Sequence, residues 1–236
     1  MSTKKLFTTI VGLMVAAGIH AQYNYNIQCE DTCRHIHGLD MSHYQGTVFW
    51  EAVSEVAEGK IFYVYLKASE GGDNIDKRYA ENIRLAKQSG LKVGSYHFYR
   101  PRQPQIIQLR NFRAQCRPQD QDLVPMIDVE ATGGLSSSAL CDSLHIFLDL
   151  VEKEYHCKPL VYTGRNFYNK HLLGELDGYK LMIAQYSNEE PFLSDERDIF
   201  AWQYTGKGSI RGVNGFVDKS RLMGNHTMRE IRYYKK

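Results

Sequence analysis

Two hydrophobic patterns alternate along the chain. Short runs of aromatic and branched residues, typical of buried strands, are separated by stretches in which apolar residues recur at helical spacing. Strands are expected at residues 35–40, 62–69, 92–99, 124–130, 159–163, 180–186, 199–204 and 215–218. Helices are expected at residues 48–58, 76–89, 103–116, 136–155 and 165–172.

The order of these elements predicts the fold. About eight strands, of which the first five are each followed by a helix, indicate a mostly parallel α/β sheet. The length and the single continuous pattern favour one irregular TIM-like β/α barrel, irregular because the late strands have little helix between them. No repeat or linker interrupts the pattern, so we expect one domain over residues 35–236.

The N-terminal residues have the layout of a secretory signal peptide. Lys4 and Lys5 precede an apolar, uncharged run at residues 6–18, and Ala21 offers a cleavage site. The run is short for a membrane span, although a short membrane anchor is the alternative. We therefore expect residues 1–21 to be removed, residues 22–34 to form a polar leader, and the protein to be exported to the periplasm or the medium without stable membrane insertion.

Composition narrows the possible partners. Hydrophobic residues make up 43% and charged residues 24% of the chain, as in soluble globular proteins. Without the two lysines of the signal peptide, basic and acidic residues balance at 27 each. A neutral total argues against nucleic acid or an anionic membrane as the main partner. We expect a monomer.

The cysteines leave several states open. The chain has Cys29, Cys33, Cys116, Cys141 and Cys157, an odd number whose pairing cannot be read from sequence. Two of them lie close to two histidines, but their spacing matches zinc sites poorly, and a local disulfide or free thiols are the alternatives. The histidines are His35 and His37. No other His/Asp/Glu cluster has ligand spacing, so we expect no metal and no cofactor.

Acidic residues recur where predicted strands end. Asp40, Glu70, Asp128 and Asp218 each close such a run. In α/β barrels the strand ends on one face build the active site, so these carboxylates are expected at one rim.

The segment Asp128-Val129-Glu130 is the most informative of these strand ends. Residues i and i+2 of a strand point to one side, so both carboxylates should face the same space. Crowded carboxylates cannot both ionise cheaply, which leaves one as a proton donor and the other charged. Glycosidic cleavage needs this pairing. A polar strand terminus is the alternative for the tripeptide taken alone.

Aromatic residues also gather at predicted strand ends, and as a set they suggest a carbohydrate groove, although barrel core is the alternative for any one of them. They are Tyr65, Tyr96, Phe98, Tyr99, Tyr162, Tyr186, Trp202 and Tyr204.

With these motifs the chain resembles the family 25 glycoside hydrolases, lysozymes that cut cell-wall peptidoglycan. The matching segments follow the family order at residues 37–50, 62–72, 90–101, 125–130, 159–172, 202–208 and 213–222. The resemblance implies an irregular β/α barrel that binds peptidoglycan glycan strands. It also implies hydrolysis of the β-1,4 bond between N-acetylmuramic acid and N-acetylglucosamine.

Site roles follow from the resemblance. Glu130 matches the proton donor, Asp128 the carboxylate that steadies the transition state or the acetamido group, and Asp40 and Asp218 the other two acids. The residues expected to bind or support substrate are Lys67, Glu70, Tyr96, Tyr162, Tyr186, Trp202, Gln203 and Tyr204. In this last group Tyr186 and Trp202 come from the aromatic set alone, and the others match family positions.

The chain departs from the family pattern in places. Met182 replaces an expected tryptophan, a change predicted to alter stacking in one subsite, whereas Ser69 and Met41 are minor changes. Two other functions remain open at this point: a glycan-binding protein that has lost catalysis, and a hydrolase of another hexosamine polymer such as chitin.

Overall fold

Eight strands close into a barrel in the computed structural model, which describes residues 36–54 and 61–234. In ring order they are β1 (His37–Met41), β2 (Ile61–Glu70), β4 (Lys92–Phe98), β5 (Met126–Asp128), β6 (Leu160–Gly164), β7 (Leu181–Ala184), β8 (Ala201–Gly208) and β9 (Val217–Leu222). All neighbours are parallel except β9, which runs antiparallel to both β8 and β1. The predicted irregular β/α barrel is confirmed.

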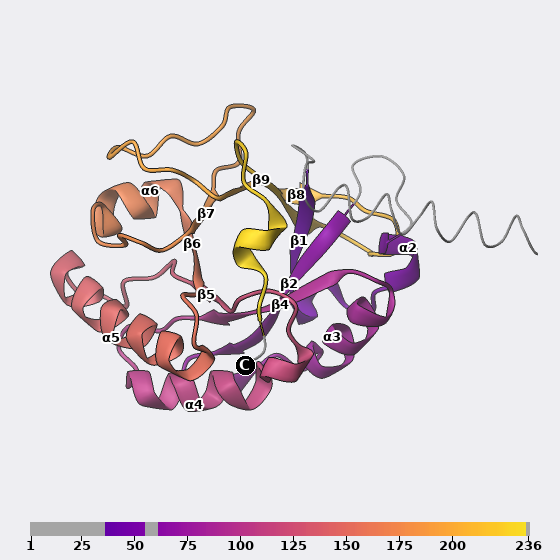
Figure 1. Cartoon of the computed structure of the whole chain (residues 1–236), viewed down its shortest axis with the longest axis horizontal. Coiled ribbons are helices and arrows are strands. Elements are labelled where there is room, and N and C mark those ends of the chain that lie inside the picture. The colour runs from indigo at the N-terminus through magenta and orange to yellow at the C-terminus, as the bar shows by residue number, and fades with distance from the viewer. Residues whose placement is uncertain (1–35, 55–60, 235–236) are drawn as a thin grey trace, which may run out of the picture.

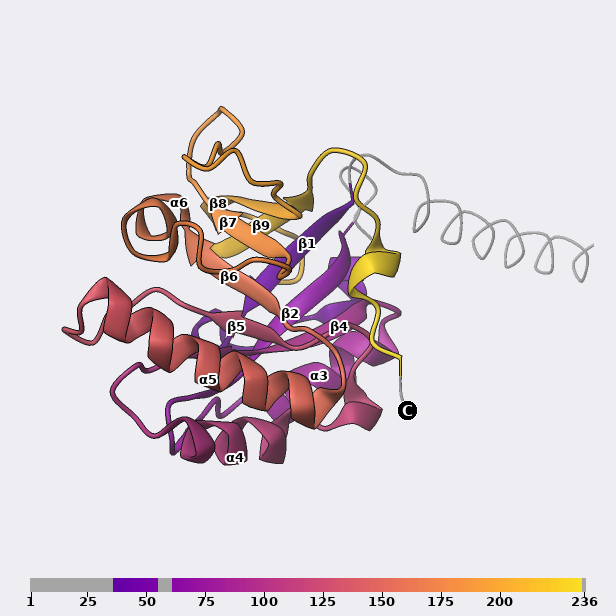
Figure 2. The same ribbon diagram turned by 60° about the vertical axis from the view of Figure 1, so that its left-hand side comes forward.

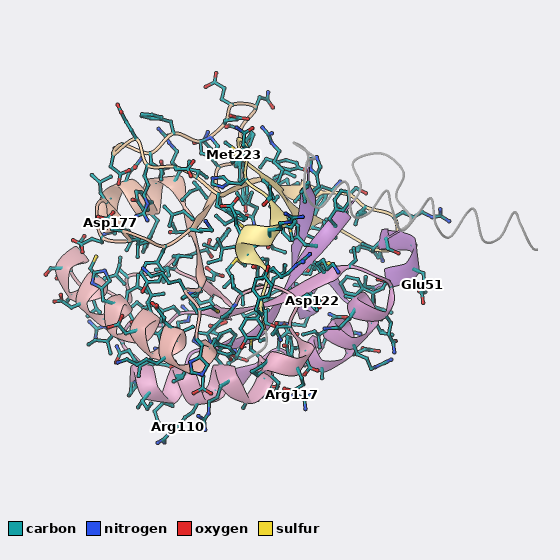
Figure 3. The ribbon with its side chains drawn as sticks, in the orientation of Figure 1. Glu51, Arg110, Arg117, Asp122, Asp177 and Met223 are labelled. Atoms are coloured by element: carbon teal, nitrogen blue, oxygen red, sulfur yellow. The ribbon has the colours of Figure 1, made fainter. Side chains whose placement is uncertain are left out.

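The helices cover only part of this barrel. They are α2 (Trp50–Ser54), α3 (Tyr79–Gln88), α4 (Gln105–Gln115), α5 (Ser137–Tyr155) and α6 (Arg165–Phe167), which continues as the π-helical turn η3 (Tyr168–Leu172). Helices α3, α4 and α5 lie together on one side, and loops accompany β7, β8 and β9 (Figures 1 and 2). Charged side chains such as Arg110 of α4 project away from the barrel (Figure 3).

Short elements complete the chain. The 3-10 turns are η1 (His43–Gln45), η2 (Pro118–Asp120) and η4 (Met228–Ile231). The two-residue strand β3 (Asn74–Ile75) pairs with the end of β2 outside the ring. No sequence pattern predicted β3, because two residues are too few to show alternation.

Several predicted strands have different bounds in the structure, and two of these differences bear on the expected site. The strand expected at 124–130 is only Met126–Asp128, so Glu130 lies beyond it. The strand expected at 215–218 begins at Val217 and continues to Leu222. The apolar pattern predicts only its first two residues, because the second half contains polar residues such as Lys219 and Arg221.

Two hydrophobic clusters hold the barrel together. The larger one lies between strands and helices and includes Leu144, Phe147 and Leu148 of α5. The smaller one includes Tyr63 and Tyr65 of β2, together with apolar residues of β5, β6 and β7 at alternate positions, as expected for the barrel interior.

Glycines on the neighbouring strands make room for these tyrosines. A Cβ at Gly38 would lie 2.1 Å from the ring of Tyr63, and one at Gly94 would lie 2.3 Å from that of Tyr65. The hydroxyl of Tyr65 donates to the carbonyl of Val124 at 3.1 Å. The interior is therefore filled by two large rings that only glycine neighbours can accommodate.

Several predictions concern residues outside the described ranges. The signal peptide, the polar leader and the group Cys29, Cys33 and His35 all fall there. Within the described ranges Cys116 and Cys141 are free thiols, and no group of three or more His, Cys, Asp or Glu side chains could hold a metal. None of the helices described is both long and apolar enough to cross a membrane.

Candidate active site

A cavity of about 270 Å³ opens at the end of the barrel where the parallel strands terminate. Its walls come mainly from the side chains that lie next to the interior cluster on the same face of each strand. Lys67 lies two residues after Tyr65 in β2, and Asp128 lies two residues after Met126 in β5. The lining residues are Asp40, Met41, Ser42, Tyr44, Gln45, Lys67, Tyr96, Phe98, Met126, Asp128, Glu130, Tyr162, Tyr186, Gln203 and Asp218.

Asp40 and Asp218 face each other across the β1–β9 pair, in register. Asp218 is the second residue of β9 and does not end a strand, contrary to the sequence-based expectation; it reaches this rim because β9 runs antiparallel. Burial, reinforced by Asp218, raises the pKa of Asp40 to about 7. Burial and the charge of Glu130 raise the pKa of Asp218 to about 6.

Gln203 of β8 connects several walls of the cavity. Its Oε1 accepts hydrogen bonds from the hydroxyls of Tyr162 at 2.9 Å and Tyr186 at 2.8 Å. Its Nε2 donates to Oδ2 of Asp40 at 2.9 Å. Because Gln203 is only 1% exposed, these bonds hold its amide in one orientation.

Asp128 and Glu130 both line the cavity but differ in exposure. Asp128 ends β5 and is 7% exposed, Glu130 stands at the open mouth, and Val129 between them is buried in the other cluster. Burial and the neighbouring charge of Glu130 raise the pKa of Asp128 well above its ordinary value. Desolvation also raises the pKa of Glu130, so both carboxyls hold a proton more readily than isolated ones do.

Two carboxylate oxygens in the cavity have no hydrogen-bond partner within the described structure. They are Oδ1 of Asp40 and Oδ1 of Asp128, both buried. Buried acceptors without a donor are costly, so each is suited to receive an N–H or O–H group from a bound ligand.

Glu70, predicted to bind substrate, does not line the cavity. Its carboxylate accepts from Lys67 Nζ at 2.6 Å and from Arg100 Nε at 2.9 Å. Partial burial raises the pKa of Glu70, but these two cations outweigh it and lower the pKa on balance. Glu70 therefore acts as an anchor for Lys67, which does reach the cavity.

Trp202 and Tyr204, also predicted to bind substrate, lie off the cavity. They alternate with Gln203 in β8, and since Gln203 points inward, both neighbours point outward. Trp202 Nε1 donates to the carbonyl of Gln185 at 2.8 Å, and the Tyr204 hydroxyl contacts His37 Nδ1 at 3.2 Å. These contacts support the wall from behind.

Met182, where a changed subsite was expected, is fully buried in the interior cluster and does not line the cavity. Conversely, Ser42, Tyr44 and Gln45 line the cavity although no site role was predicted for them. They lie within five residues of Asp40, the predicted strand end, and this proximity is the signal by which the sequence could have indicated them.

A barrel with carboxylates gathered at its mouth is typical of glycoside hydrolases, and comparison with known proteins agrees. The family model for Glycosyl hydrolases family 25 matches residues 39–213. The chain is 30% identical over 204 residues to the uncharacterized protein YegX of Escherichia coli K12, which covers 84% of this chain and 73% of that protein. It is 32% identical to the autolytic lysozyme of Clostridium acetobutylicum, over 77% of this chain and 54% of that one.

Solved structures show the same architecture. A family 25 glycosyl hydrolase from Bacillus anthracis superposes with a TM-score of 0.73 at 26% identity, covering 80% of this chain and 89% of that one. A lysozyme from Streptomyces coelicolor matches the fold with a TM-score of 0.74 at 23% identity, over 84% and 96% of the chains. The class is therefore that of the glycosidases. The chain belongs to glycosyl hydrolases family 25.

Proposed function

We propose that the protein hydrolyses the β-1,4 bond between N-acetylmuramic acid and N-acetylglucosamine in bacterial peptidoglycan. The observation that carries the proposal is the meeting of Asp40, Asp128, Glu130 and Asp218 in one cavity of a family 25 barrel. The autolytic lysozyme among the relatives supports the same substrate.

In this proposal Glu130 is the general acid. It stands at the open mouth, where it can reach the oxygen of the leaving sugar, and desolvation keeps its pKa above the ordinary value. Asp128, deeper in the cavity, has the unpartnered Oδ1. An acetamido N–H of the substrate donating to that oxygen would favour the charged form of Asp128 and leave the shared proton on Glu130.

Asp40 and Asp218 complete the negative wall. An oxocarbenium-like transition state gains positive charge, which these carboxylates would stabilise when ionised. Gln203 would hold Asp40 in position through the hydrogen bond to Oδ2, leaving Oδ1 free for a sugar hydroxyl.

The proposed site of action follows from residues 1–21, which have the layout of a signal peptide. Export to the periplasm or the medium would bring the domain at 35–236 to the cell wall. N-terminal sequencing of secreted protein should begin after Ala21, and an intact Met1 would contradict this.

The chemical test uses Glu130→Gln. Removal of a general acid should lower the rate of peptidoglycan cleavage by about 10²–10⁴-fold without unfolding the protein. Glu51→Gln, at an exposed position of α2, is the control and should retain wild-type turnover. Mass analysis of the digest should show N-acetylmuramic acid at the new reducing ends.

Three outcomes would contradict the proposal. Wild-type turnover by Glu130→Gln would refute the acid assignment, binding of glycan strands without release of reducing ends would identify a glycan-binding protein, and faster cleavage of chitin would identify another substrate.

A further inference from the structure

The turn after β1 is strongly braced, yet it leaves a large aromatic ring in solvent. Tyr44, the middle residue of η1, is 81% exposed and lines the cavity. Ser42 and Gln45 form a capping box across the turn, in which the Ser42 N–H donates to Gln45 Oε1 at 2.8 Å. The turn is therefore held at both ends.

A buried carboxylate braces the same turn from below. Asp76, 6% exposed, accepts hydrogen bonds from the backbone N–H of His43 at 2.8 Å and from its Nδ1 at 2.7 Å. The imidazole of His43 in turn contacts the ring of Tyr44, with centroids 4.2 Å apart. One face of the tyrosine thus rests on a ring that is itself anchored.

The far side of the turn is tied to the strand that carries Asp218. Gln45 Nε2 donates to the carbonyl of Phe216 at 3.2 Å, two residues before Asp218. Phe216 is itself 64% exposed. Two exposed aromatic residues, Tyr44 and Phe216, therefore stand at this rim. Tyr44 lies just after the strand with Asp40, Phe216 lies just before the strand with Asp218, and the Gln45 hydrogen bond joins the two segments.

Apolar ring surface in water is unfavourable, and holding the turn in one conformation costs entropy. The arrangement therefore points to a ligand that covers the rings. A cavity of about 270 Å³ is small for a polysaccharide segment, since pockets for drug-sized ligands already begin at about 300 Å³. A bound glycan strand must therefore continue over the rim.

We propose that Tyr44 is a stacking platform for a sugar of the glycan strand outside the cavity, and so determines preference for long strands. The proposal rests on the function proposed above. Tyr44 would act through its ring face, with the His43–Asp76 pair as the positioning group, and it would take no part in proton transfer.

Binding to Glu130→Gln protein tests this, because the strands then stay intact. Calorimetry should show that adding Tyr44→Ala raises the Kd for peptide-free glycan strands by about 2- to 12-fold, the range for loss of an aromatic contact. The Kd for the disaccharide repeat, followed by NMR titration, should rise by a smaller factor. Tyr44→Phe should bind strands like the parent.

Matched variants separate the platform from general damage. Tyr234→Ala removes a tyrosine that is 67% exposed and borders a cavity at the other end of the barrel, so strand binding should not change. Asp76→Ala, checked for folding by circular dichroism, should weaken strand binding in the same direction as Tyr44→Ala.

The proposal is overturned if Tyr44→Ala changes strand affinity less than twofold, if strand and disaccharide lose affinity equally, if Tyr44→Phe is as weak as Tyr44→Ala, or if the parent binds no strands. Cleavage by the wild-type enzyme is measured separately, so failure of the proposed hydrolysis is distinguished from failure of the platform.

Discussion

Gln203 is the residue on which the geometry of the cavity most depends. A glutamine amide can accept at one end and donate at the other, and here it does both, between two tyrosine hydroxyls and the carboxylate of Asp40. Because Tyr186 is 62% exposed and Asp40 is buried, the amide links a group that meets solvent to one that does not.

Replacement of Gln203 should change the titration of Asp40. The hydrogen bond from Gln203 lowers the pKa of that carboxyl, opposing the effect of burial. In Gln203→Leu we expect the pKa of Asp40 to rise by about one to two pH units, since hydrogen bonds to charged groups contribute about 1.5–3 kcal/mol. Carboxyl ¹³C NMR would measure this, with Asp40→Asn to assign the signal.

Gln88→Leu, an exposed change on α3, should leave the Asp40 signal unmoved. An unchanged pKa in Gln203→Leu would show that the amide does not govern Asp40.

At the scale of single residues, sequence could place the acids but not every partner. Asp40 and Asp128 end predicted strands, so their common rim followed from barrel topology. The positions of Trp202 and Tyr204 depended on which face of β8 points inward, and here the face with Gln203 does, whereas the aromatic face was expected to meet the substrate. The bonds of Gln203 join strands far apart in sequence, which no local pattern encodes.

At the scale of elements, β2 organises the barrel interior. On one face of β2, Tyr63 and Tyr65 belong to the interior cluster, and Lys67 lines the cavity. Their rings need the absence of side chains at Gly38 on β1 and Gly94 on β4. The packing of these two rings against the glycines thus determines how deep the cavity reaches into the barrel.

Gly94→Ala tests this packing. The new methyl group would lie 2.3 Å from the Tyr65 ring, so we expect destabilisation of about 1–3 kcal/mol in urea unfolding, as for other overpacked interiors. Gly164→Ala at the end of β6, where no atom lies within 4 Å of the new Cβ, should change stability by less than about 0.5 kcal/mol. Equal effects at the two positions would contradict the argument.

Most helices and strands could be predicted because each has its own hydrophobic period. The bounds of several strands, β5 and β9 among them, could not. Asp128 and Glu130 read as one strand because both face the cavity, although the strand ends at the first of them. The direction of β9 is decided by pairing with β1 and β8, a property of the closed ring rather than of the segment.

At the scale of the whole molecule, the cavity makes stability depend on pH. Asp40 and Asp218 have folded-state pKa values of about 7 and about 6, well above the ordinary value of 3.8. Between pH 4 and pH 7 the native state therefore holds protons that the unfolded chain has released, and stability falls as pH rises through that window.

We expect the free energy of unfolding to be lower at pH 8 than at pH 5, with about 2–3 kcal/mol of the difference due to Asp40. Urea titrations at the two values measure it. Asp40→Asn should remove that share and be more stable than wild type at pH 8, while losing activity. A wild-type protein that is more stable at pH 8 than at pH 5 would contradict the assignment.

The last strand of the ring is also the one that closes it. A ribosome delivers β9 after the other seven strands of the ring, and until then β1 and β8 present unpaired edges and the mouth lacks Asp218. A chain that lacks β9 thus holds an incomplete set of acids, and the full set is assembled only when β9 pairs with β1 and β8.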